Sequence, residues 1–137
     1  MKNIYKPLDD FVKAGIEKPF GHRLHLNIKG FDTLYVRIAT HCIVGRMART
    51  LDISSVDVKE SCQNKGLFKN LLKHCESLAV QYGLAVYVES VQNEHLAKYL
   101  SKIGYVSDGS PIASSFHKSH DTLAHEHRCE TDSSPTP

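Results

Sequence analysis

The sequence lacks the features that would place the chain in a membrane or outside the cell. No apolar run approaches the roughly 20 residues that a membrane-spanning helix needs, and the first residues, MKNIYKP, lack the apolar stretch of a secretion signal. The four cysteines form no C-x-x-C pair and no framework spacing, which favours reduced thiols over disulfides or a zinc site. We therefore expect a cytoplasmic protein without a membrane partner.

Two loop motifs that bind nucleotides are also missing. Neither G-x-x-x-x-G-K-[ST], which cradles triphosphates, nor G-x-G-x-x-G, which binds dinucleotides, occurs in the chain. The formal net charge is only +2, although residues 1–50 carry nine Lys and Arg against four Asp and Glu. This basic bias falls well short of the charge of a dedicated nucleic-acid binder. We therefore expect that nucleic acid is an unlikely partner.

Composition and periodicity predict one α/β domain of the α+β kind. The chain has 137 residues, of which 41% are hydrophobic, and this suits a single core. Apolar residues at helical spacing predict a helix over residues 8–17, and alternation predicts strands over 22–28, 34–38 and 47–58. Turn residues between the strands favour consecutive antiparallel pairing.

The second half of the chain changes between helix and strand. The longest apolar stripe predicts a helix over residues 66–82, followed by a buried strand over 84–88 and a second helix over 94–102. Two short runs, at 105–106 and 112–116, predict a closing hairpin. After the first helix, the predicted order is thus three strands, a helix, a strand, a helix and a hairpin.

Beyond residue 117 the composition turns to His, Ser, Thr, Asp and Pro. Such a segment buries little apolar surface, so we expect a domain over residues 1–117 and a disordered tail over 118–137. Imidazole and thiolate side chains in this region offer an alternative, a metal site, but their spacing matches no structural zinc pattern, and we favour a solvated tail without metal. These side chains are His117, His120, His125, His127 and Cys129.

A strand, a loop and a helix meet at Gly66. The predicted strand ends at Val58, and a short loop leads to the glycine that opens the helix. Unpaired amides at a helix start, aligned with the positive end of the helix dipole, form a natural seat for a pyrophosphate. Glycine allows left-handed backbone angles and close backbone approach, and Lys65 adds a cation. The pattern predicts a phosphate-binding loop.

Two motifs here resemble the GNAT superfamily of N-acetyltransferases. The loop QNKGLF at residues 63–68 is similar to the family's coenzyme A loop, Q/R-x-x-G-x-G/A. At the family's spacing, Asn93 then precedes an alanine-containing helix that ends in Ile103-Gly104-Tyr105. The resemblance covers about residues 20–117. It implies a GNAT fold, in which helices flank a mixed, mostly antiparallel and twisted sheet, here with an abridged N-terminal part.

The resemblance also implies acetyl-coenzyme A as co-substrate and transfer of its acetyl group to an amine. The pyrophosphate would lie on the loop amides, and the pantetheine arm would pair with the strand that ends at Val58. The residues that the resemblance assigns to the cofactor are Val56, Val58, Gln63, Asn64, Lys65, Gly66, Leu67, Phe68 and Asn93.

Two positions depart from the family pattern. Phe68 stands where the family usually has glycine or alanine, so the helix start is bulkier. The family's tyrosine, commonly the acid that protonates the leaving thiolate, would fall at position 100, where this chain has leucine. Tyr99 comes one residue early, which on a helix is about 100° of rotation. Tyr99 is therefore either the acid or a packed tyrosine.

Attack on a thioester also needs a base, because an ammonium must lose its proton first. Asp52 is the first candidate, since it lies six residues before Val58 and alternates in phase with Ser54, Val56 and Val58. Glu89, at the end of the following strand, is the second and could act through a water. The alternatives are a hydrogen-bonded strand aspartate and an exposed strand end.

Few residues precede the first predicted strand, so the acceptor groove is expected to be open and to suit a protein or peptide amine. Histidines and arginines beside this groove could recognise an acidic acceptor, but we favour a solvated sheet face. Two rival functions remain, an acyl-coenzyme A-binding module without catalysis, and a small nucleic-acid-binding protein. The oligomeric state stays open, a dimer included. The basic and imidazole side chains concerned are His22, Arg23, His25, Arg37, His41, Arg46 and Arg49.

Overall fold

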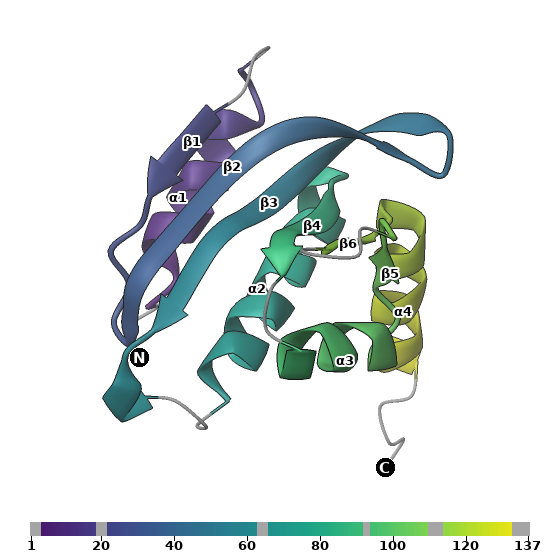
Figure 1. Ribbon diagram of the computed structural model, residues 1–137. Coiled ribbons are helices and arrows are strands. Elements are labelled where there is room, and N and C mark those ends of the chain that lie inside the picture. The colour runs from purple at the N-terminus through teal and green to yellow at the C-terminus, as the bar shows by residue number, and fades with distance from the viewer. Residues whose placement is uncertain (1–3, 19–21, 63–65, 92–93, 110–113, 133–137) are drawn as a thin grey trace.

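A computed structural model describes residues 4–18, 22–62, 66–91, 94–109 and 114–132. Figure 1 shows a twisted sheet with helices packed against it. In chain order the elements are α1 (Lys6–Gly15), β1 (His22–His25), β2 (Phe31–Ile43), β3 (Arg46–Val58), the 3-10 turn η1 (Glu60–Cys62), α2 (Leu67–Tyr82), β4 (Ala85–Val91), α3 (Glu94–Lys102), β5 (Val106–Ser107), β6 (Ser114–Lys118) and α4 (His120–Asp132).

The described strands form one sheet in the order β1-β2-β3-β4-β6-β5. All neighbours are antiparallel except β3 and β4, which are parallel. A parallel pair needs a long crossover, and α2 supplies it. The mixed, mostly antiparallel sheet that the sequence predicted is confirmed.

Strands β3 and β4 diverge after a short paired stretch. Thr50 to Ile53 pair with Ala85 to Val88, and no further β3–β4 pair occurs among the described residues. Strand β3 nevertheless continues to Val58. The last part of β3 therefore keeps backbone groups on the edge that β4 has left.

A β-bulge at Ser54 changes the phase of β3. Ile53 pairs with Val36 on β2, but Ser55 pairs with Tyr35, so Ser54 is an additional residue. Val56 then pairs with the buried Leu34 and lies on the core face. Asp52 lies on the opposite face, because its neighbours Leu51 and Ile53 point into the core. The predicted in-phase alternation of Asp52 with Val56 and Val58 is therefore wrong.

One core unites the sheet with α1 and α2. Helices α1 and α2 lie side by side behind the sheet (Figure 1), and the Nε2 of His74 lies 2.5 Å from the Oδ1 of Asp9. The ring of Tyr5 stacks on His74. The fully buried side chains at the centre of this core include Leu8, Val12, Leu34, Val36, Ile38, Leu51, Ile53, Leu71, Leu72 and Val86.

Some boundaries differ from the prediction. Helix α1 begins at Lys6 rather than residue 8. The first turn accepts Pro7 because N–H groups have no partner within the helix there, and proline lacks an N–H. Strand β1 ends at His25 rather than residue 28, and β2 spans Phe31–Ile43 rather than 34–38. Helix α3 has the predicted bounds. Of the predicted hairpin, the described parts β5 and β6 pair antiparallel.

The expected disordered tail from residue 118 is contradicted up to residue 132, where α4 ends. Ser119 begins the helix, since its Oγ accepts a hydrogen bond from the amide of Thr122 at 3.2 Å. Leu123 is only 3% exposed and packs in the core cluster. The expected domain end at residue 117 is therefore not a boundary, because tertiary contacts order a segment that is polar by composition.

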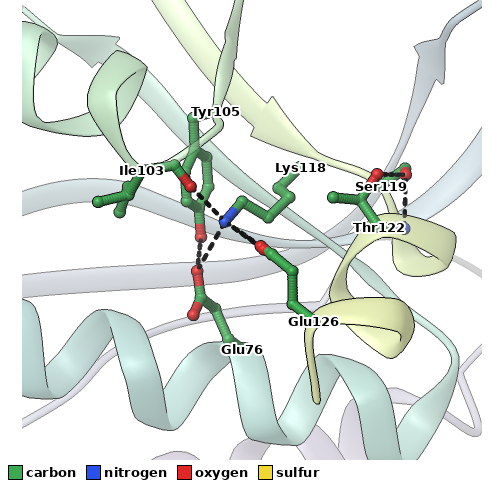
Figure 2. A network of polar contacts seen from close by, with 7 residues as sticks. All are labelled: Glu76, Ile103, Tyr105, Lys118, Ser119, Thr122 and Glu126. Carbon is green, nitrogen blue, oxygen red and sulfur yellow. Dashed lines mark hydrogen bonds and ion pairs between the residues drawn. The ribbon is translucent and has the colours of Figure 1, made fainter. Parts of the chain in front are cut away.

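A buried lysine ties α4 to the rest of the fold (Figure 2). The Nζ of Lys118 donates to the backbone carbonyl of Ile103 at 2.7 Å and to the carboxylate of Glu126 at 2.7 and 2.9 Å. Glu76 on α2 lies 3.8 Å from the same ammonium and accepts a hydrogen bond from the hydroxyl of Tyr105 at 2.6 Å. The ammonium of Lys118 on β6 thus joins carboxylates of α2 and α4.

The four thiols, Cys42, Cys62, Cys75 and Cys129, are free, as predicted. Burial raises the pKa of Cys75 far above its ordinary value. Within the described ranges, no helix combines the length and hydropathy that crossing a bilayer requires.

Candidate active site

A pocket of about 450 Å³ lies beside the part of β3 that β4 has left. Three elements build it, namely the end of β3 with the following turn, the start of α2, and α3. Its lining residues are Val56, Asp57, Val58, Cys62, Gly66, Leu67, Phe68, Lys69, His95, Leu96 and Tyr99.

Gly66 sets the start of α2 at this pocket. Its φ of 73° lies in the left-handed region, which favours glycine. A Cβ on Gly66 would meet no atom within 4 Å, so the backbone conformation and not the available space requires the glycine. The first amides of α2 have no carbonyl partner within the helix, and they carry the positive end of its dipole. This end of α2 suits an anion.

The predicted cofactor residues gather at this pocket wherever the structure describes them. Val56, Val58, Gly66, Leu67 and Phe68 all line it. The side chain of Phe68 is also packed against the core, so it forms part of the pocket wall. The remaining predictions, residues 63–65 and Asn93, lie outside the described residues.

Helix α3 presents Tyr99, not residue 100, to the pocket. Leu100 is fully buried in the core, whereas Tyr99 lines the pocket. Partial burial, together with the charge of Glu76, raises the pKa of Tyr99. A phenol with a raised pKa keeps its proton but gives it up less readily than an ordinary tyrosine, so the raised pKa does not itself favour Tyr99 as the acid.

Sequence reasoning missed two side chains on the pocket wall, the ammonium of Lys69 and the imidazole of His95. The ammonium of Lys69 lies 5.0 Å from the ring centroid of Tyr99 and so joins α2 to α3. Their positions in the sequence could have indicated both residues, because Lys69 lies in the first turn after Gly66 and His95 follows Asn93.

Asp52 lies on the other face of the sheet and is fully buried. Its Oδ2 accepts hydrogen bonds from Arg37 Nε at 3.0 Å and His41 Nε2 at 2.7 Å, and Thr50 Oγ1 donates to its Oδ1 at 2.5 Å. The ring of His41 stacks on Tyr87 with centroids 3.8 Å apart. The predicted base is thus enclosed by donors that the sequence did not assign to it.

Glu89 is the accessible carboxylate of this group. Its side chain is 21% exposed, and it forms an ion pair with Arg37. Arg37 therefore links Asp52 on β3 to Glu89 on β4 at the level where the two strands cease to pair. The expectation that Arg37 and His41 belong to a solvated sheet face is wrong, because both bind Asp52.

Ligand atoms of His41, Asp52 and Glu89 lie within 4.8 Å of one another, close enough to hold a metal ion. The guanidinium of Arg37 already pairs with both carboxylates. A second cation at this point would be repelled by that charge. The donor set therefore suits an ion-pair network better than a metal.

The pocket lies on one face of the sheet, and the carboxylates of Asp52 and Glu89 lie on the other. Val56 and Val58 line the pocket from the core face, whereas Asp52 and Glu89 belong to the other face. Between them lies the place where β3 and β4 stop pairing.

No family model matches the chain, and no curated protein does. Several solved structures do match the chain. A putative acetyltransferase from Agrobacterium tumefaciens is similar with a TM-score of 0.54 at 17% identity, over 84% of this chain and 87% of that chain. The chain has the GNAT fold. The strand order, the crossover helix and the diverging strands described above belong to this fold.

Two further neighbours of the same fold come from larger assemblies. The KacTA–DNA complex matches with a TM-score of 0.52 at 15% identity, over 91% of this chain and 84% of that chain. The AtaT Y144F toxin, bound to the C-terminus of the antitoxin AtaR and acetyl-CoA, matches with a TM-score of 0.50 at 14% identity. The match covers 69% of this chain and spans 64% of the AtaT chain. At these identities the likeness concerns the fold.

Proposed function

We propose that the protein is an N-acetyltransferase that transfers the acetyl group of acetyl-coenzyme A directly to an amine. The observation that carries the proposal is the pocket at the diverging strands, which Gly66 and the start of α2 help to line. The QNKGLF loop leads into this same point. Acetyl-CoA is also bound in two neighbours of the same fold.

The pocket suggests how the co-substrate lies. The pyrophosphate occupies the loop that ends at Gly66 and the first amides of α2, with Lys65 and Lys69 as cations. The pantetheine arm runs along Val56 to Val58 and uses the backbone groups that β4 leaves unpaired. Asn93, by the family resemblance, holds the far side. The thioester then lies near Ser54, where the strands part.

Glu89 is the better base on structural grounds. Asp52 has no exposed surface and accepts three hydrogen bonds, whereas Glu89 is partly exposed and faces the side opposite the pocket. Glu89 takes the amine proton, directly or through a water, while Asp52 holds Arg37 and His41 in place. The amine nitrogen attacks the thioester carbonyl carbon, and Tyr99 supplies the acid for the leaving thiolate.

A macromolecular amine is the acceptor that we favour. One neighbour of this fold is a complex with an antitoxin segment and another is a complex with DNA. The expectation that nucleic acid is an unlikely partner has no support from these neighbours, and we do not retain it.

Calorimetric titration with acetyl-CoA tests the co-substrate. Release of free coenzyme A, followed by mass spectrometry over a panel of small amines, peptides and proteins, then tests transfer. Binding without release of thiol by any acceptor would favour the second candidate, a non-catalytic acyl-CoA-binding module, for which Leu100 in place of tyrosine is the motivation. Acetylation of small amines alone would refute the macromolecular acceptor. Absence of binding would refute both functions.

A further inference from the structure

A second cavity, of about 480 Å³, adjoins the pocket beside β3. Lys69 and Tyr99 line both spaces, so the two cavities meet at this pair of side chains. The second cavity lies among α2, α3 and α4, with Lys118 at the end of β6. Its volume falls in the range of about 300–1,000 Å³ that is typical of small-ligand sites. It is therefore large enough to take part of a ligand that also occupies the first pocket.

The second cavity carries an excess of positive charge. Three lysines, Lys69, Lys73 and Lys118, line it together with two carboxylates, those of Glu76 and Glu126. Both carboxylates are already paired with the ammonium of Lys118 (Figure 2). The ion pairs among the described residues include neither Lys69 nor Lys73, and both of these lysines are exposed. Their two charges therefore favour an anionic ligand.

The two lysines form a stripe on α2 that leads away from the start of the helix. Lys69 and Lys73 are four residues apart, about one turn or 6 Å along the axis, and so lie on the same face of α2. Ser77 extends the stripe by a further turn and also lines the second cavity. Lys69 lies in the first turn after Gly66, next to the proposed pyrophosphate site. An anion bound by Lys73 would thus lie about one turn beyond the pyrophosphate.

Coenzyme A carries another anionic group at a matching place. Its adenosine has a 3′-phosphate, which a single ribose separates from the pyrophosphate. In the proposed arrangement the pantetheine arm follows β3, so the adenosine lies beyond the start of α2. The second cavity adjoins this point and combines the ammonium of Lys73 with the apolar side chains of Val80 and Ile103. A phosphate and a flat aromatic base suit this combination.

We propose that the second cavity binds the 3′-phosphorylated adenosine of acyl-coenzyme A and that Lys73 contacts the 3′-phosphate. This inference rests on the proposed function and names a second binding region for the same co-substrate. It also gives a role to α4, which follows the segment that resembles the family and contributes His125 and Cys129 to the wall of the cavity.

Calorimetric titration with acetyl-CoA and with acetyl-3′-dephospho-CoA, which lacks only that phosphate, tests the assignment. At constant ionic strength, wild-type protein should bind acetyl-CoA about tenfold more tightly, the value of one charge-assisted hydrogen bond. Lys73→Gln should remove this preference by weakening the binding of acetyl-CoA alone. Lys102→Gln, which changes an exposed lysine of α3 that lines neither cavity, is the matched control and should retain the preference.

Cys129 reports on the occupancy of the second cavity. It is exposed and lines this cavity, whereas Cys42 is exposed on β2 and lines neither cavity. Saturating acetyl-CoA, or 3′,5′-ADP as the phosphorylated adenosine alone, should slow modification of Cys129 by a maleimide several-fold. The rate at Cys42 should not change, and S-acetylpantetheine, which lacks the adenosine, should protect neither thiol. Peptide mass spectrometry of the native chain follows the two thiols separately.

Three results would overturn the proposal: equal affinity of wild-type protein for the two thioesters, a preference that survives in Lys73→Gln, or a Cys129 rate that saturating acetyl-CoA leaves unchanged. With acetyl-CoA still bound, each of these leaves the proposed acetyltransferase function intact. The wild-type preference and the protection of Cys129 depend on no variant, and neither requires turnover. If wild-type protein binds no acetyl-CoA, the proposed function and this inference fail together.

Discussion

His41 Nε2 lies 2.7 Å from the Oδ2 of Asp52, the same oxygen that accepts a hydrogen bond from Arg37. The carboxylate that alternation and family spacing favoured as base is thus held by two side chains of β2. In the proposed mechanism Asp52 holds Arg37 and His41 in place while Glu89 is the base, so mutations of the two carboxylates should have different effects.

Asp52→Asn should act mainly on stability. It leaves the partly buried Arg37 and His41 without their carboxylate, and breaking a buried charged pair costs about 3 kcal/mol. Urea denaturation measures the loss, with Asp57→Asn, an exposed position on the same strand, as control. Equal stability of the two variants would contradict the positioning role of Asp52.

Glu89→Gln should act mainly on turnover. Removing a general base lowers kcat about 100-fold or more, while binding of acetyl-CoA stays unchanged because Glu89 does not line the pocket. Steady-state kinetics with an identified acceptor measure the effect, and Glu94→Gln on the exposed start of α3 is the control. Full activity of Glu89→Gln would remove Glu89 from the mechanism.

Cys62 offers a direct probe of the pocket. It is partly exposed and lines the pocket, whereas Cys75 is buried. In a Cys42→Ser, Cys129→Ser background, acetyl-CoA should slow modification of Cys62 by a maleimide, because the bound molecule covers the thiol. Mass spectrometry follows the rate. An unchanged rate at saturating acetyl-CoA would show that the co-substrate lies elsewhere.

Lys118→Met should destabilise the fold. Lys118 is 4% exposed and neutralises Glu126 and Glu76, so its loss leaves two carboxylates facing each other and costs about 3 kcal/mol. Denaturation measures the effect. Combining Lys118→Met with Glu76→Gln and Glu126→Gln should recover much of it, because the repulsion is then gone. No recovery would show that packing, not charge, is responsible.

His117 should make stability depend on pH. Burial lowers its pKa from the ordinary 6.5, with His41 lowering it further and Asp108 opposing. Below about pH 6.5 the unfolded chain then binds this proton more readily than the folded one, so stability falls as pH falls towards the lowered pKa. The drop in thermal midpoint between pH 7.5 and 5.5 should be smaller in His117→Gln than in wild type or in His127→Gln. Equal drops would contradict the prediction.

Local patterns predicted the parts of the fold that depend on nearby residues. The apolar stripe of α2 and the bounds of α3 follow from helical periodicity, and the left-handed turn before α2 follows from a glycine at position 66. Because the pocket is built from the end of β3 and the starts of two such helices, most of its described lining was also predictable.

The arrangement around Asp52 was not predictable in the same way. Arg37 and His41 come 15 and 11 residues before Asp52, and only the pairing of β2 with β3 brings them to it. The bulge at Ser54 results from the register between those strands and moves Val56 to the face opposite Asp52. Alternation within one strand cannot reveal an extra residue that only the partner strand defines.

By itself the sequence thus determined most elements along the chain and the glycine that opens α2, since periodicity and turn chemistry act over a few residues. Tertiary structure alone decided which carboxylate is enclosed and that α4 is ordered. Those outcomes depend on contacts between residues distant in sequence, such as Lys118 on β6 with Glu76 on α2, and the periodicity of a single segment does not reveal such contacts.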